Sequence, residues 1–161
     1  FSADQRAVYE VVLEAQLAAI DAVRPGAAFD APHQAALALL CAGLVRLGIL
    51  AGTVEEALAG QAYQRFYMHR TSHWLGLDVH DCGAYLANGK PRKLEPGMVL
   101  TVEPGLYFAA DETAIDARWR GIGVRIEDDV LVTPDGHEVL TRGIPKSVDE
   151  VEAAWRKEQA R

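Results

Sequence analysis

The chain has 161 residues, half of them hydrophobic, which suffices for one substantial core in a single domain or in a large part of one. Its 23 acidic residues outnumber 16 lysines and arginines, and the net charge of −7 offers no basic surface for nucleic acid. No run approaches the roughly 20 apolar residues that cross a bilayer. Two cysteines without metal-site or disulfide spacing favour a reducing compartment. The composition therefore predicts a soluble cytoplasmic protein with neither nucleic acid nor a membrane as its partner.

Three helical segments are expected first. Apolar residues recur at helical spacing over residues 4–23, and a proline-glycine pair ends this run. Asp30 is expected to cap, with its side chain, a second and well-buried helix over residues 30–47. Thr53 begins a capping-box pattern that predicts a short third helix over residues 53–60.

From residue 66 onward, aromatic and β-branched residues alternate with glycine and proline, which is typical of short strands and turns. We expect strands near residues 75–80, 97–103, 122–127, 129–133 and 137–141, and a closing helix over residues 148–158. Helices followed by strands indicate the α+β class, with the helices packed on a curved antiparallel sheet.

Three histidines, His69, His73 and His80, fall within twelve residues. His69 and His73 stand four apart, as do the two metal-binding histidines on one helix face of zinc peptidases, but Arg70 occupies the place of the catalytic glutamate. The residues after His73 alternate as in a strand, so we do not expect all three imidazoles to bind one ion. A single histidine is more simply a hydrogen-bonded structural residue; a cluster of three favours chemistry.

Two glutamates follow apolar runs. Glu103 ends a run that should be a buried strand, so its carboxylate requires a partner. Glu127 shares a strand face with Arg125, which leaves open a plain ion pair between the two. One imidazole converging with two carboxylates would form an oxygen-rich site that suits Mn²⁺, Co²⁺ or Fe²⁺, with catalytic Zn²⁺ as an alternative. Such an ion activates water, and amide hydrolysis is its natural use.

Three segments carry a resemblance to a known family: residues 68–81 (MHRTSHWLGLDVHD), 94–105 (LEPGMVLTVEPG) and 120–129 (RGIGVRIEDD). Together they closely resemble the Xaa-Pro aminopeptidases, or aminopeptidase P, and the preceding helices fit the catalytic domain of that family. The resemblance implies the α+β pita-bread fold of creatinase and the aminopeptidases, present here in part. It also implies metal-dependent release of the N-terminal residue from peptide substrates with proline second.

The resemblance implies two divalent metal ions in the full-length enzyme, usually manganese, with cobalt or zinc as alternatives. His73, Glu103 and Glu127 correspond to metal ligands of the family. Glu127 corresponds to a ligand that bridges the two ions, and Glu103 is also placed to handle the proton of the attacking water.

Further residues correspond to the substrate side of the family's site. His69 and His80 match catalytic histidines that face the substrate. Arg125 matches a catalytic residue beside the ligands that also meets the substrate, and Tyr107 shares its hydrogen bonds. Arg70 departs from the family's pattern, because many relatives have glycine there, so substrate contacts near His69 are expected to differ.

The family takes five metal ligands, and two of them are aspartates on a β-hairpin that precedes a segment like Phe1-Ser2. This chain contains no match to that hairpin. We therefore expect residues 1–161 to be the C-terminal portion of one metallopeptidase catalytic domain, without the N-terminal domain and the hairpin. The isolated fragment is expected to hold at most one weakly bound ion and to be inactive. The full-length enzyme is expected to be a homo-oligomer.

Two other functions are open. Prolidase, the Xaa-Pro dipeptidase, shares the fold and the ligands, although Trp74 and the run from Gly121 to Gly123 favour aminopeptidase P. Some pita-bread proteins are binding modules that have lost their ligands and catalyse nothing. The presence of every ligand that this part of the domain could contain argues against such a module.

Overall fold

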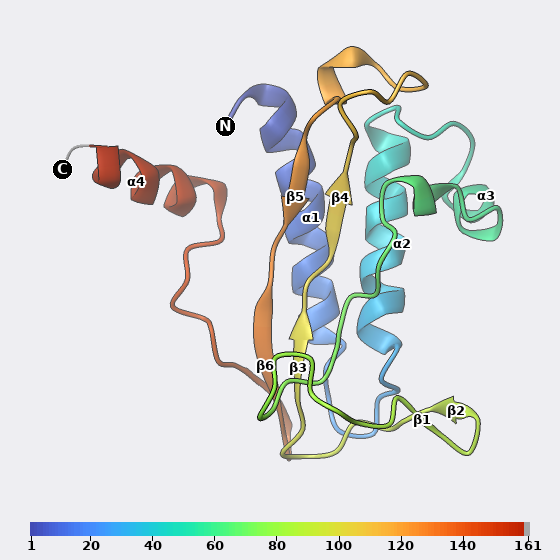
Figure 1. The fold of residues 1–161 in the computed structure, drawn as a ribbon, viewed down its shortest axis with the longest axis vertical. Helices are drawn as coiled ribbons and strands as arrows, with labels where there is room; N and C mark the ends of the chain where they lie inside the picture. Colours follow the sequence, from blue (N-terminus) through green and yellow to red (C-terminus); the bar gives the residue numbers. More distant parts are fainter. Residues whose placement is uncertain (160–161) are drawn as a thin grey trace.

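The computed structural model describes residues 1–159, and its two long helices lie side by side against one face of a narrow antiparallel ribbon (Figure 1). α1 spans Ala3–Asp21 and α2 spans Ala31–Arg46, as the apolar spacing predicts. A capping box begins α1, because Ser2 Oγ accepts from the Gln5 amide while the Gln5 side chain accepts from the Ser2 amide.

The remaining helices largely follow the sequence pattern. α3 spans Val54–Ala59 and begins with the predicted capping box, in which Thr53 Oγ1 accepts from the Glu56 amide. α4, Val148–Gln159, confirms the expected closing helix and extends away from the body (Figure 1). Two 3₁₀ turns, η1 (Ala62–Arg65) and η2 (Ala117–Trp119), were not anticipated. The side-chain cap expected of Asp30 is wrong, since its carboxylate makes no capping hydrogen bond.

In the described part of the chain, seven strands form three small antiparallel sheets. β3 (Val99–Val102), β6 (Asp128–Thr133) and β7 (Gly136–Val139) form one sheet, and β4 (Gly105–Tyr107) pairs with β5 (Gly123–Arg125). β1 (Leu86–Ala87) and β2 (Lys90–Pro91) form a separate hairpin that the sequence reading missed. The four expected strands beyond residue 97 are confirmed within a few residues, and β4 is an additional one.

The two longer pairings are halves of one ribbon. Val102 pairs with Asp128 at the end of the β3–β6 ladder, and Gly105 pairs with Arg125 where the β4–β5 ladder begins. Between them the ladder is interrupted by residues 103–104 on one strand and 126–127 on the other. The strands remain adjacent there, because the Ile126 amide donates to the Pro104 carbonyl at 3.3 Å.

The strand expected near residues 75–80 is absent. Trp74 makes a single bridge to Leu100, and the chain then bends through exposed residues. Leu77 and Val79 alternate with polar residues as in a strand, but both side chains are exposed. No strand of the described chain pairs with residues 76–80. Alternation predicts a strand only where one face has a core to cover.

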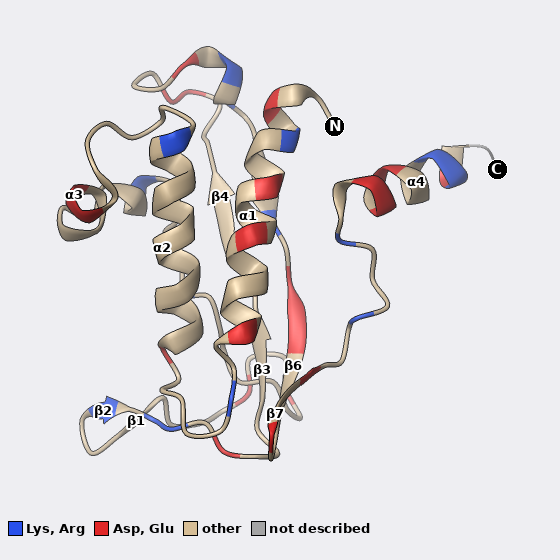
Figure 2. Cartoon of the chain, turned by 180° about the vertical axis from the view of Figure 1, so that it is seen from behind, with Lys and Arg blue, Asp and Glu red and all other residues tan. Residues whose placement is uncertain are grey.

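A buried polar cluster fastens the ribbon to α1. Asp128, only 1% exposed, accepts hydrogen bonds from the Gln16 side chain on α1 and from Thr141 Oγ1, and Lys146 Nζ lies 2.9 Å from its Oδ1. The acidic start of β6 is visible in Figure 2. Asp128 thereby joins α1, β6 and the segment that leads to α4.

No helix among residues 1–159 has the length and apolar character needed to cross a membrane.

Close approach of α1 and α2 depends on Gly43. A Cβ at this position would lie 2.2 Å from Val11 Cγ1 of α1. We expect Gly43→Ala to destabilise the protein, because overpacking costs about 1–3 kcal/mol, more than the roughly 1 kcal/mol that alanine gains in a helix. Chemical denaturation measures the change. Gly143→Ala, where a Cβ meets open space, is the control. Adding Val11→Ala to the Gly43→Ala variant should recover part of the lost stability. Equal stability of Gly43→Ala and Gly143→Ala would contradict the packing argument.

Candidate metal centre

An extended segment beside β3 and β4 carries the histidines into the site. Its hydrogen bonds follow an antiparallel register: the Thr101 amide donates to the His73 carbonyl at 3.0 Å and the Glu103 amide to the Thr71 carbonyl at 2.8 Å. At the other end the Tyr107 amide donates to the Phe66 carbonyl at 2.9 Å. These bonds hold the residues between Phe66 and His73 on the edge of the ribbon that β5 and β6 leave open.

His73, Glu103 and Glu127 converge at the interruption in the ribbon. One potential ligand atom from each lies within 4.8 Å of the other two, and His73 Nε2 is 3.3 Å from Glu103 Oε1. His73 Nδ1 lies 2.9 Å from the Trp74 carbonyl, to which it donates its proton. This bond orients the ring so that Nε2 faces the two carboxylates, which is the nitrogen that a metal ion would take.

Glu103 has the partners that its burial requires. It is 9% exposed; Thr101 Oγ1 donates to its Oε1 at 3.1 Å, and Arg125 Nη1 lies 3.4 Å from its Oε2. The simple ion pair between Arg125 and Glu127 is wrong as an alternative, because among the described residues Arg125 pairs with Glu103 instead. The interrupted ladder turns Glu103 toward the arginine across the ribbon.

The ionised form of Glu127 is disfavoured by partial burial and by its position beside Glu103. Partial burial, the negative charge of Glu103 and that of Asp129 together raise the pKa of Glu127 above its ordinary value. The two carboxylates repel each other, and together with His73 Nε2 they attract a cation. The donor set of one nitrogen and several oxygens fits a divalent ion such as Mn²⁺, Co²⁺ or Zn²⁺.

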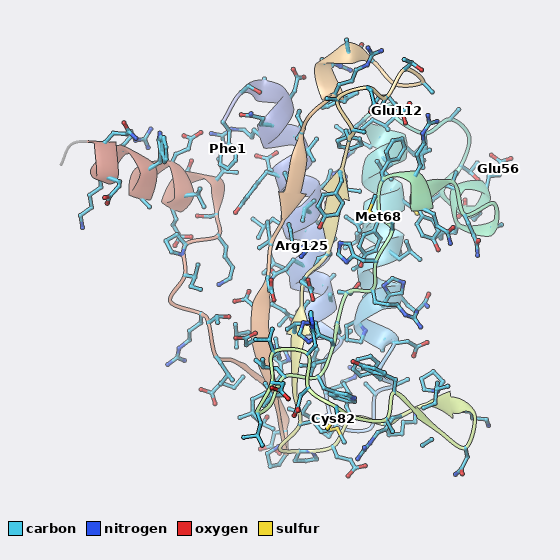
Figure 3. The ribbon with its side chains drawn as sticks, in the orientation of Figure 1. Phe1, Glu56, Met68, Cys82, Glu112 and Arg125 are labelled. Atoms are coloured by element: carbon cyan, nitrogen blue, oxygen red, sulfur yellow. The ribbon has the colours of Figure 1, made fainter. Side chains whose placement is uncertain are left out.

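A chain of hydrogen bonds leads from the carboxylates to His69. Arg125 Nε donates to the Tyr107 hydroxyl at 2.7 Å, and this hydroxyl lies 2.9 Å from His69 Nε2. His69 Nδ1 donates to the Arg70 carbonyl at 2.7 Å, so its Nε2 accepts from Tyr107. The bond to Tyr107, ahead of the nearby carboxylates, raises the pKa of Arg125 and keeps it charged. Figure 3 places Arg125 at the middle of the ribbon, beside the segment that carries Met68.

His80 reaches the same site from the exposed loop. Its ring packs edge-on against His73, with 4.4 Å between the ring centroids. The structure thus brings all seven sequence-predicted residues to one region, with His69, Tyr107 and Arg125 on one side of the carboxylates and His80 on the side of His73.

The sequence reading missed a second group of polar residues behind His69. His33 Nδ1 lies 2.9 Å from Thr71 Oγ1, and the buried Tyr67 hydroxyl contacts the same Thr71 oxygen. His33 lies on α2, far from the other histidines in sequence, and no local spacing relates it to them. Thr101, which contacts both His73 and Glu103, is another residue that only the register of the ribbon reveals.

Fold and site together define an α+β protein with a candidate divalent-metal centre at the break of an antiparallel ribbon. The chain belongs to metallopeptidase family M24, whose model matches residues 1–134. It is 54% identical over 154 residues to Xaa-Pro aminopeptidase 2 of Streptomyces coelicolor, which covers 95% of this chain and 33% of that protein. The structure of aminopeptidase PepP from Pseudomonas aeruginosa superposes with a TM-score of 0.98 at 55% identity, over 100% of this chain and 36% of that one.

These comparisons confirm the expected α+β pita-bread fold and the resemblance to aminopeptidase P. Human Xaa-Pro dipeptidase is a more distant relative, 39% identical over 181 aligned positions that cover 95% of this chain and 36% of that protein. The chain spans about a third of the length of these relatives.

The repulsion at Glu127 gives a prediction for the metal-free protein. Because folding raises the pKa of this carboxyl, its ionised form costs stability above the folded pKa and costs nothing below the unfolded value near 4.5. We expect Glu127→Gln to raise the thermal midpoint at pH 7 in EDTA. Solvent screening keeps the corresponding gain in the free energy of unfolding below about 1 kcal/mol. The gain should fade as the pH falls toward 4.5.

Glu138→Gln, an exposed glutamate on β7, is the matched control and should leave the midpoint nearly unchanged. A lower midpoint for Glu127→Gln at pH 7 would mean that its charge is compensated in the absence of metal.

Proposed function

We propose that the protein to which this chain belongs is a metal-dependent Xaa-Pro aminopeptidase, which releases the N-terminal residue from peptides with proline second. The convergence of His73, Glu103 and Glu127 is the observation that carries the proposal. The strong similarity to several Xaa-Pro aminopeptidases supports it. One related structure, of aminopeptidase P from E. coli, is described with the inhibitor Pro-Leu, which supports a peptide substrate.

His73 Nε2 and the carboxylates of Glu103 and Glu127 would hold divalent metal, with two ions in the full-length enzyme. Manganese is the proposed metal; a zinc-substituted form of E. coli aminopeptidase P leaves zinc as an alternative, and cobalt is another. When bound, such ions supply a Lewis acid for the scissile carbonyl and a nucleophilic water near neutral pH.

The chain's own residues have separate tasks. Glu103 accepts the proton of the attacking water, and its contacts with Thr101 and Arg125 hold the carboxylate in place. His80 lies against His73, where a ring N–H can donate to the substrate carbonyl as negative charge develops on its oxygen. His69 faces the substrate from the other side of the carboxylates, and its Nε2 accepts from the Tyr107 hydroxyl. Arg125 and Tyr107 orient His69 and contact the substrate.

The same site leaves the Xaa-Pro dipeptidase as the second candidate, since a relative with that activity covers the same part of the chain. A non-enzymatic binding module is the third. The aminopeptidase and the dipeptidase differ in the length of the peptide that they cleave. A non-enzymatic binding module would not bind metal and would not cleave peptides.

A substrate comparison tests the proposal. The whole protein, loaded with Mn²⁺, is expected to cleave a tripeptide with proline second at least tenfold faster than the dipeptide Gly-Pro, measured as kcat/KM. His73→Ala removes a proposed metal ligand, so this variant should lose the metal, as measured by elemental analysis. Its kcat/KM should fall by at least about 10²-fold.

His137→Ala is the matched control. His137 is bonded to the Val23 carbonyl at 2.9 Å and lies outside the site, so this variant should keep metal and activity. Preference for the dipeptide would establish a prolidase, and a metal-binding protein without either activity would overturn the enzymatic proposal.

We further propose that residues 1–161 are the C-terminal portion of one metallopeptidase catalytic domain, so that further ligands come from another segment of the protein. The full-length enzyme is proposed to be a homo-oligomer. On this basis the isolated chain holds at most one weakly bound ion and is inactive, because three ligands bind far less tightly than a complete set.

Titration of the isolated chain with Mn²⁺ tests this division. Calorimetry should give a stoichiometry of at most one and an affinity at least about tenfold weaker than that of the whole protein. Glu127→Gln should abolish the remaining binding, whereas Glu138→Gln should not. Two tightly held ions in the isolated chain would contradict the proposed division of the site.

A further inference from the structure

A cavity of about 580 Å³ lies beside His69, and the roles proposed above involve none of its other lining residues. Its walls come from three elements: His33 of α2, Tyr63 of η1, and the segment formed by Tyr67, Met68, His69 and Arg70. No aspartate or glutamate is among the described residues that line it. His69 lines this cavity and also contacts Tyr107, so it lies between the cavity and the candidate site.

Arg70 is the only fully charged side chain among the described residues of this wall. It is exposed and forms no ion pair with any carboxylate of residues 1–159. Asp30 shares a second, very small cavity with Arg70 but does not come within ion-pair distance of it. Burial, and next the charge of Arg70, lower the pKa of His33, so its imidazole is neutral at pH 7 and does not compete with Arg70 for an anion.

The remaining wall suits an amphipathic group. Met68 is largely exposed and Tyr63 half-buried, and both offer apolar surface for methylene groups. At the rim, Gln64 Nε2 donates to Gln61 Oε1 at 3.2 Å, which leaves amide groups for hydrogen bonds with a peptide backbone. An arginine over such a wall has the donor geometry for a carboxylate.

We propose that this cavity is a subsite for a carboxylate of the peptide substrate, with Arg70 as the residue that recognises it. The proposal rests on the proposed peptidase function. Two sources supply this chemistry: the side chain of an aspartate or glutamate near the scissile bond, and the C-terminal carboxylate of a short peptide. Either carboxylate would contact Arg70 while the uncharged part of the peptide lies beside His69. Arg70 determines specificity and takes no part in the bond-breaking step.

Matched peptides test the subsite with the whole protein. Each pair carries proline second and differs by Glu or Gln at one position, placed in turn at the first, third and fourth residue. A further pair compares a free with an amidated C-terminus. We expect about fivefold to tenfold higher kcat/KM for the carboxylate member of one pair, as for a partly desolvated ion pair, and a preference that weakens as salt is raised. Arg70→Gln should abolish this preference.

Arg142→Gln is the matched control, since Arg142 is also exposed and without an ion pair among residues 1–159 but lies outside the cavity and the site. It should keep the preference of the wild type. The pair that shows the preference identifies its source, a side chain or the C-terminus. Equal rates within every pair, or a preference unchanged in Arg70→Gln, would overturn the subsite.

A binding measurement separates this result from failure of the proposed function. Fluorescence anisotropy of the same labelled peptides with metal-free protein should give the same ratio of affinities within the preferred pair, again lost in Arg70→Gln. If the protein cleaves no proline peptide but the binding ratio persists, the peptidase proposal fails and the subsite stands. If cleavage occurs without any carboxylate preference in rate or binding, the subsite fails and the peptidase proposal stands.

Discussion

Two like charges held at the break of an antiparallel ribbon are the constraint on which the rest of this structure depends. Glu103 and Glu127 occupy the interruption between the β3–β6 and β4–β5 ladders, where regular pairing would send neighbouring side chains to alternate faces. Partial burial, and next the repulsion from Glu103, raise the pKa of Glu127. An arrangement with this cost is understandable if a cation offsets it, and the lone pair of His73 Nε2 points to the same place.

Hydrogen bonds and an ion pair from neighbouring elements hold the Glu103 and Glu127 carboxylates close together despite their repulsion. Asp128 follows Glu127 directly and is fastened to α1 through Gln16 and to the chain before α4 through Thr141 and Lys146. On the other strand, Thr101 contacts both Glu103 and His73. Each carboxylate therefore has a rigid neighbour, and rigidity of this kind keeps a ligand set assembled before the ion binds.

The sequence predicted what depends on local pattern. Capping boxes at Ser2 and Thr53 are local, although only the second was recognised, and the apolar spacing of α1 and α2 follows from their shared core. The partner of Arg125 and the contact between His33 and Thr71 depend on register and on distant segments, which spacing along the chain does not reveal. Alternation after Trp74 predicted a strand that is absent, because no strand within residues 1–159 pairs with residues 76–80. The three histidines, the two glutamates and Arg125 were singled out from their clustering and strand positions. Tyr107 and the role of each residue came from resemblance to a family, and the geometry came only from the fold.

Charge is distributed unequally across the site, and this bears on how a peptide would lie in it. Glu103, Glu127 and Asp129 make the region of the ribbon break negative, and Arg125 neutralises only part of that charge. The cavity beside His69 has the opposite character, because Arg70 lines it and no carboxylate is among its described lining residues. A peptide amine is attracted toward the first region and a peptide carboxylate is repelled from it and attracted toward the second. If the proposed peptidase function holds, this polarity would orient a peptide substrate with its N-terminus toward the candidate metal centre before any specific contact forms.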